Sequence, residues 1–108
     1  MASPANKLQL EILKKLRADG VMIWKNQFNT FNHKLGFHTN DPYSPVGSSD
    51  LLGVMPDGTG RILCIEIKAG KDHMSPGQIL FQKRIHSLGG VYLVARSIDD
   101  VKQLIKEN

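Results

Sequence analysis

The sequence contains a single cysteine, Cys64, among its 108 residues. One cysteine cannot form a disulfide within the chain, and it excludes a zinc module built from several cysteines. Long apolar runs are also missing, since no stretch approaches the roughly 20 residues that a membrane-spanning helix needs. Residues 1–6 lack the basic, apolar and small-residue parts of a signal peptide. We therefore expect a cytoplasmic protein with no membrane partner.

The composition that is present fits one small globular domain. Hydrophobic residues make up 41% and charged residues 22% of the chain, close to the globular average, and this length suits one core but not two. Lys and Arg number 14 against 10 Asp and Glu, which gives a formal charge of +4. This excess permits a polyanionic partner without proving one.

Apolar periodicity predicts an α/β domain. Apolar residues recur at helical spacing over residues 4–19, after the Ser3-Pro4 start and before Gly20. Further elements are expected as strands at 21–24, 49–55, 61–68 and 91–94, and as helices at 76–88 and after a Ser97 cap. The α-β-β-β-α-β order predicts a single domain over 1–108 with a central mixed β-sheet flanked by helices. Residues 25–47 sustain no period, which predicts a long loop.

The clearest local pattern is a predicted β-hairpin. Two apolar runs, residues 49–55 and 61–68, flank a turn at 56–60 that is rich in glycine and proline. Residues equally far from the middle of this turn lie opposite each other, so Asp50 pairs with Glu66. The Cβ atoms of opposed residues lie about 4.5–5.5 Å apart, and two like charges at that distance destabilise a sheet unless a cation lies between them.

The paired carboxylates therefore predict a divalent metal site. Mg²⁺, with Mn²⁺ as the alternative, takes one or two carboxylates and keeps waters that a phosphate substrate displaces. Lys68 lies two residues beyond Glu66 and projects from the same face of the strand. Its ammonium can orient a water that attacks phosphorus and offset charge on the phosphate. The structural alternative is a salt bridge of Glu66 with Lys68, with Asp50 capping a turn.

These residues, with one further segment, resemble the signature of the PD-(D/E)XK nucleases, specifically of the VRR-NUC branch. The resemblance rests on an ordered set of motifs: Gly47-Ser48-Ser49-Asp50, the hairpin, Glu66-Ile67-Lys68 and Ser75-Pro76-Gly77-Gln78. It extends over about residues 8–101, and Ser49 stands where the family usually has proline. It implies a restriction-endonuclease-like core and metal-dependent hydrolysis of phosphodiester bonds in DNA.

The resemblance also implies roles for individual residues. Asp50 and Glu66 would bind the metal, the Ile67 carbonyl would add a backbone ligand, and Lys68 would assist the attacking water. Glu11 is a second-tier ligand candidate, because related nucleases often carry an acid on the first helix that reaches the same site. Its structural alternative is a helix-surface ion pair with Lys15.

Gln78 has two interpretations. Its spacing from Ser75 fits a capping box, in which the glutamine side chain returns to the backbone N–H of the cap residue. Gln78 also falls on the apolar stripe of its helix, so it faces the sheet, where it could hydrogen-bond a metal ligand or a water. The family pattern favours the second interpretation.

The long loop is the expected DNA contact. Lys25, Asn26, Asn29 and Lys34 lie among three phenylalanines with no acid before Asp41. Amides and cations of this kind contact the sugar-phosphate backbone, and aromatic rings stack on exposed bases. The alternative is that the phenylalanines pin the loop to the core and the polar groups are solvated.

Other residues are expected to be structural. Trp24 and Cys64 are assigned to the core, and His73 and His86 to the surface. His33 and His38 suggest a His-metal-finger nuclease only weakly, because that site needs a histidine on a strand leading into a ββα unit.

The expected partner is branched DNA, in the form of a four-way junction, cleaved by a homodimer. A small chain has room for one active site, whereas a junction needs two cuts, and a twofold dimer supplies both. The stand-alone domains that this chain resembles are associated with such cleavage. Two alternatives remain: a flap- or end-directed nuclease, and a non-catalytic nucleic-acid-binding module or structural subunit that retains the fold.

Overall fold

The computed structural model describes residues 3–26, 29–32, 37–40 and 47–105. Helix α1 (Pro4–Ala18) begins at Ser3, whose hydroxyl accepts a hydrogen bond from the Asn6 amide. The other elements of the main body are β1 (Ile23–Lys25), β4 (Leu51–Val54), β5 (Ile62–Ile67), α2 (Pro76–Ser87), β6 (Val91–Ala95) and α3 (Asp99–Lys102). They follow the α-β-β-β-α-β order predicted from the sequence, with α3 last.

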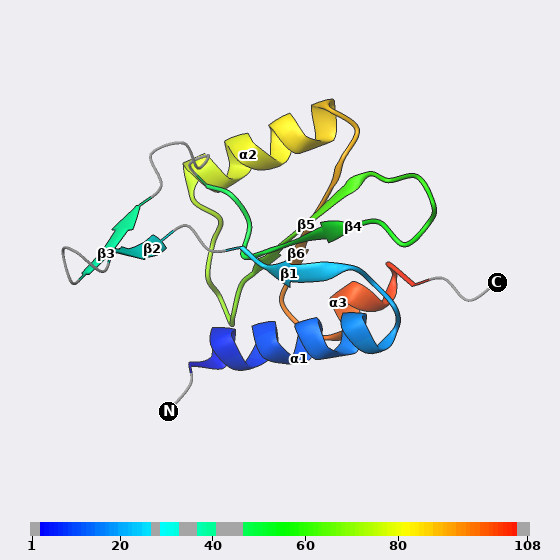
Figure 1. The fold of residues 1–108 in the computed structure, drawn as a ribbon, viewed down its shortest axis with the longest axis horizontal. Helices are drawn as coiled ribbons and strands as arrows, with labels where there is room; N and C mark the ends of the chain where they lie inside the picture. The colour runs from blue at the N-terminus through cyan, green and yellow to red at the C-terminus, as the bar shows by residue number, and fades with distance from the viewer. Residues whose placement is uncertain (1–2, 27–28, 33–36, 41–46, 106–108) are drawn as a thin grey trace.

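These strands form one four-stranded mixed sheet in the order β1-β4-β5-β6. Strands β1 and β4 pair antiparallel, as do β4 and β5, and β6 runs parallel to β5 after the α2 crossover. Helix α2 lies on one side of the sheet, and α1 and α3 lie on the other (Figure 1). The predicted α/β class with a central mixed sheet and flanking helices is confirmed.

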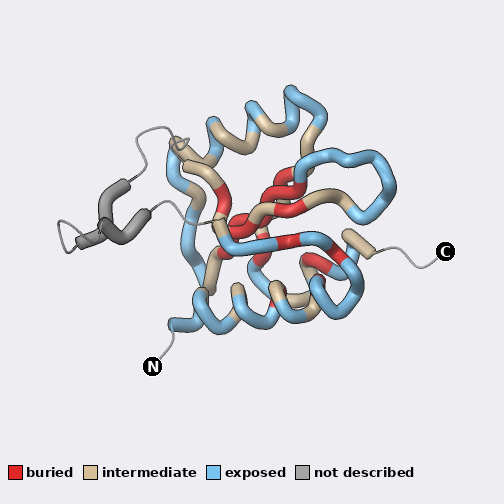
Figure 2. Tube along the Cα trace, viewed as in Figure 1, coloured by how far each residue is buried: buried red, intermediate tan, exposed pale blue. Residues whose placement is uncertain are grey.

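The hydrophobic core lies between the sheet and helices α1 and α3. Alternate residues of β5, namely Leu63, Ile65 and Ile67, point into it and pack with Ile12 and Leu16 of α1. Figure 2 shows the buried segments gathered in the middle of the sheet, while much of the outer surface of the helices is exposed. Because strand side chains alternate between faces, the residues between these three on β5 point toward α2.

The hairpin of β4 and β5 has the predicted register. Leu51 pairs with Ile65 and Leu52 with Cys64, pairs that lie equally far from the middle of the turn. The turn itself is held by Asp57, whose carboxylate accepts hydrogen bonds from Thr59 and Arg61. Extended by one residue, this register brings Asp50 opposite Glu66.

Three expectations are wrong. The segment between residues 25 and 47 is not wholly a loop, because β2 (Asn29–Asn32) and β3 (Phe37–Asn40) pair as a two-stranded antiparallel sheet. Asparagines in both strands hide this pair from a search for apolar alternation. Ser97 does not cap α3: Ile98 is at the cap position, and the Asp100 carboxylate accepts from the backbone N–H groups of Arg96 and Ser97.

The third error concerns Trp24, which is 41% exposed instead of buried in the core. It lies on β1, the edge strand of the sheet, which has a neighbour on one side only. Cys64 is buried and His73 and His86 are exposed, as expected. Within the described ranges, none of the helices combines the length and the apolar character that crossing a bilayer requires.

Candidate active site

Asp50 stands just before β4, at the end of the ladder with β5. The β4–β5 pairing ends at Leu51 and Ile65, but β5 continues to Ile67. The Ile67 amide therefore has no backbone partner on β4 and instead donates to Asp50 Oδ2 at 2.8 Å. The N–H and C=O groups of one strand residue point to the same side. The Ile67 carbonyl therefore faces the same edge as the Asp50 carboxylate.

Glu66 is buried opposite Asp50, with 3% of its surface exposed. Its Oε1 accepts a hydrogen bond of 2.9 Å from Gln78 Nε2 and lies 3.8 Å from Lys68 Nζ. Its Oε2 is buried and has no hydrogen-bond partner in the described structure. Burial, followed by the negative charge of Asp50, raises the pKa of Glu66 to about 8, and the nearby Lys68 ammonium opposes this shift only in part.

Gln78 fulfils both of its predicted roles at once. Its Oε1 accepts a hydrogen bond of 2.9 Å from the Ser75 amide, and Ser75 Oγ accepts from the Gln78 amide, which completes the capping box. Its Nε2 is left free to donate to Glu66. The first turn of α2 is thus tied directly to the buried carboxylate.

The segment that leads to Asp50 packs tightly against the start of α2. Gly47 has φ of 79°, and a Cβ placed on it would lie 2.3 Å from the backbone carbon of Gly77. Only glycine fits a position with both this left-handed backbone and this close approach. The segment therefore holds Asp50 and the Gln78 turn in one rigid arrangement.

Asn26 supports the same segment from the other side. Its amide nitrogen Nδ2 donates to Ser48 Oγ at 2.9 Å and to the Ser49 carbonyl at 3.0 Å. Its backbone N–H donates to the Asp50 backbone carbonyl at 2.9 Å, which extends the β1–β4 pairing by one residue to Asp50. Asn26, predicted as a DNA contact, is thus engaged in fixing the backbone around Asp50.

Tyr92 is a site residue that the sequence did not identify. It pairs with Cys64 across the parallel β5–β6 ladder, so its side chain is on the same face as Glu66, and its buried hydroxyl has no hydrogen-bond partner in the described structure. Burial, followed by the Glu66 charge, raises the pKa of Tyr92. Its position depends on the register of strands that are distant in sequence, for which the sequence carries no local signal.

Glu11 and Lys25, two of the remaining predicted site residues, lie apart from the carboxylates. Glu11 is exposed on α1, and its alternative partner Lys15 pairs instead with Asp19 at 2.8 Å. Lys25 is exposed and shares a sheet face with Leu51, away from Glu66. The backbone of Asn29 lies in β2, whereas Lys34 lies outside the described residues.

The donor set at the end of β4 and β5 fits a hard divalent cation. Two facing carboxylates and a backbone carbonyl are oxygen ligands of the kind that Mg²⁺ and Mn²⁺ prefer. The unpartnered Oε2 of Glu66 has the free acceptor capacity that such an ion would satisfy. No group of three or more His, Cys, Asp or Glu side chains that could hold a metal gathers anywhere in the described ranges, and Glu11 does not add a third such side chain to Asp50 and Glu66.

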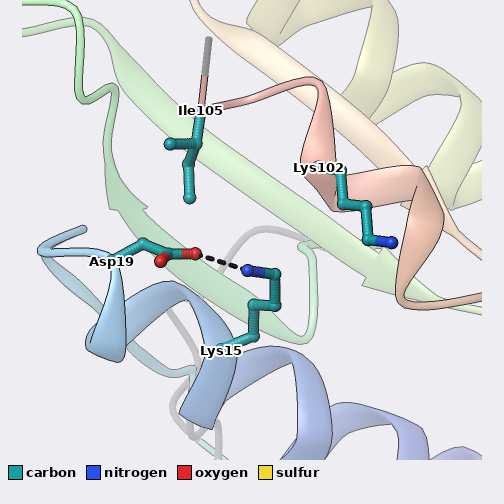
Figure 3. Close-up of a pocket in the computed structure, with 4 residues that line it drawn as sticks. All are labelled: Lys15, Asp19, Lys102 and Ile105. Atoms are coloured by element: carbon teal, nitrogen blue, oxygen red, sulfur yellow. Dashed lines mark hydrogen bonds and ion pairs between the residues drawn. The ribbon is translucent and has the colours of Figure 1, made fainter. Parts of the chain in front are cut away.

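A separate hollow of about 240 Å³ lies between the end of α1 and α3, where it is lined by Lys15, Asp19, Lys102 and Ile105 (Figure 3). Lys15 is paired with Asp19 inside it, and Lys102 pairs with Asp99 at 2.7 Å. These helices cover the face of the sheet opposite to α2 and Glu66. The hollow is therefore not part of the carboxylate site.

No protein-family model matches the chain, and a search of curated proteins finds no match. The resemblance to the VRR-NUC nucleases thus rests on the sequence motifs around Asp50, Glu66 and Gln78 alone.

Proposed function

We propose that this protein is a divalent-metal-dependent endonuclease that hydrolyses phosphodiester bonds in branched DNA. The observation that carries the proposal is Glu66: a buried carboxylate, opposed by Asp50, with one oxygen left without a partner. A buried, incompletely satisfied acid next to a second acid costs stability. Such sites are typical of functional centres.

A purely structural salt bridge explains these residues less well. The ion pair of Lys68 with Glu66 is long, at 3.8 Å, and it involves the oxygen that already accepts from Gln78. This pair leaves Glu66 Oε2 without a hydrogen-bond partner and does not involve Asp50. A metal ion held between the two acids would satisfy both, and this favours the catalytic interpretation.

The chain's own groups have clear roles in hydrolysis. Asp50, Glu66 and the Ile67 carbonyl would hold Mg²⁺ or Mn²⁺, which supplies Lewis-acid stabilisation of the phosphate when bound. Gln78 fixes the orientation of Glu66 through its hydrogen bond. Lys68 lies beside Glu66 on the same face of β5, where its ammonium can orient the attacking water and offset charge that develops on phosphate oxygens.

Cleavage assays with matched variants test this proposal. We expect four-way-junction DNA to be cut with Mg²⁺ or Mn²⁺ and to stay intact with EDTA. Glu66→Ala, Asp50→Ala and Lys68→Ala should each remove cleavage while the protein stays folded and binds DNA. Asp99→Asn, which removes an exposed carboxylate on α3, is the matched control and should cut normally. Full activity in Glu66→Ala or Asp50→Ala, or in EDTA, would overturn the assignment.

The active unit in this proposal is a homodimer, because two cuts in a junction need two sites. Sedimentation at micromolar concentration, together with cleavage of a junction and a flap of matched sequence, tests this part. A monomer that cuts the flap and spares the junction would show that the substrate is a flap and not a junction, and it would leave the metal-site assignment unchanged. A folded protein that binds DNA and never cuts it would support the alternative of a non-catalytic binding module.

A further inference from the structure

Trp24 lies on the same face of the sheet as the two carboxylates. Its neighbour Ile23 points into the core beneath α1, so Trp24 points to the opposite face, toward which Glu66 also points. Trp24 pairs with Leu52, and Asp50 is two residues before Leu52 on the same face. Diagonal neighbours of this kind have Cβ atoms about 7–8 Å apart, within reach of an aromatic side chain.

Helix α2 covers this face mainly over β6, and its first turn reaches Glu66 and the segment before Asp50. Its aromatic ring Phe81 meets Tyr92 of β6 edge to face, with 6.0 Å between ring centroids, and Ile85 packs against Gly90 just before β6. Strand β1 is at the other edge of the sheet, separated from β6 by the two strands β4 and β5 (Figure 1). Trp24 is accordingly 41% exposed, and Met22, two residues earlier, is 67% exposed.

Because Trp24 lies next to the carboxylates, the DNA that binds there determines which groups its indole can contact. Any DNA strand whose phosphate reaches Asp50 and Glu66 has nucleotides within one side chain's length of Trp24. Indole carries no positive charge to bind phosphate, but its flat face stacks on an unpaired base, and every base offers a π-face for it. A base is unpaired next to the scissile bond only where the duplex is interrupted.

We propose that Trp24 stacks on an unpaired nucleobase beside the scissile phosphate and so selects branched over continuous duplex DNA. This inference rests on the proposed nuclease function and identifies Trp24 as the side chain that recognises the branched substrate. The indole provides binding through its π-face, whereas Asp50, Glu66 and Lys68 provide the chemistry. A continuous duplex offers no free base at this position and gains nothing from the contact.

Fluorescence tests the contact without any cleavage. Trp24 is the only tryptophan in the chain, so selectively excited indole emission reports on this residue alone. With Ca²⁺ in place of Mg²⁺, junction or flap DNA should quench the emission at saturating binding. A linear duplex of the same length, bound to the same saturation, should leave it nearly unchanged. Equal quenching by both DNAs, or none by either, would overturn the proposal.

Variants then separate stacking from packing. Trp24→Ala should weaken binding of branched DNA roughly 5- to 150-fold, the range measured when a base loses an aromatic partner, and should change linear duplex binding little. Trp24→Phe should restore most of the loss, whereas Trp24→Leu, equally apolar but without a π-face, should not. Met22→Ala removes a more exposed apolar side chain of the same face, farther from Asp50, and should bind like the parent.

The outcomes distinguish this inference from the nuclease proposal. If Trp24→Ala cuts and binds junctions like the parent, the stacking role is wrong and the metal site is untouched. If the DNA is bound with selective quenching but never cut, the stacking role is supported and the catalytic proposal fails. If the emission changes with protein concentration in the absence of DNA, and sedimentation tracks that change, Trp24 is covered by a second copy of the chain and the proposal is overturned.

Discussion

Gln78 on α2 and Glu66 on β5 are joined by a hydrogen bond of 2.9 Å from the glutamine amide to the buried carboxylate. The other end of the same side chain accepts from the Ser75 amide and closes the cap of the helix. The start of α2 and the orientation of the candidate metal ligand are therefore set by one side chain. This coupling allows the two roles to be separated by substitution.

Gln78→Glu keeps an oxygen for the Ser75 amide but replaces the donor to Glu66 with a third negative charge. We expect the Mn²⁺ affinity, the cleavage rate, or both to fall about 10- to 100-fold, the usual effect when a metal ligand loses its hydrogen-bond partner. Ser75→Ala removes the other half of the cap, costs about 1 kcal/mol of stability, and leaves the Gln78 donor in place. Calorimetric Mn²⁺ titration with urea unfolding measures both quantities. Equal metal affinity in the two variants would contradict the coupling.

Gly47→Ala should be more damaging than a positive φ angle alone explains. At Gly47 an added Cβ meets the Gly77 backbone at 2.3 Å, whereas at Gly58, with a nearly equal φ of 80°, it meets nothing within 4 Å. Both alanine variants carry the strain of left-handed backbone, about 1–3 kcal/mol. Only Gly47→Ala should also displace the start of α2 and reduce cleavage. Urea unfolding and cleavage rates of the two variants give the comparison, and identical behaviour would rule out the close approach.

The stability of the metal-free protein should fall as pH rises. The pKa of Glu66 is raised from 4.5 to about 8, so between these values the folded state retains a proton that the unfolded chain has lost. The free energy of unfolding then decreases with pH across this window, by at most about 1.4 kcal/mol per pH unit. Glu66→Gln stays neutral throughout, so its stability should overtake that of the parent as pH rises. Urea unfolding in EDTA is the measurement, and parallel pH profiles would show that Glu66 does not titrate in this window.

DNA binding should depend steeply on salt because phosphate contacts dominate it. The logarithm of the binding constant is expected to fall with the logarithm of salt concentration by about 0.9 for each phosphate contact. If the segment from residue 25 to 47 binds the DNA backbone, Lys25→Ala and Lys34→Ala should each reduce the steepness of this slope by about 0.9, the value of one phosphate contact. Lys102→Ala, on α3 and paired there with Asp99, is the control. Unchanged slopes in both loop variants would show that DNA binds elsewhere.

The sequence alone determined the local features of this protein. The register of β4 and β5 follows from a short turn with apolar runs on either side, and so the opposition of Asp50 and Glu66 was predicted. The limits of α1 and α2 follow from Ser-Pro starts and glycine ends. Each of these depends on residues close together in the chain, where propensity and periodicity act directly.

Only the tertiary structure decided which residues distant in sequence share a sheet face with Asp50 and Glu66. Strand order places β1 at the sheet edge, and this exposes Trp24, which its apolar character had assigned to the core. The parallel pairing of β6 with β5 brings Tyr92 toward Glu66, and the placement of α2 lets Gln78 serve two partners. Strand order and parallel register are fixed by packing between segments far apart in sequence. Short-range sequence patterns therefore do not predict strand order or parallel register.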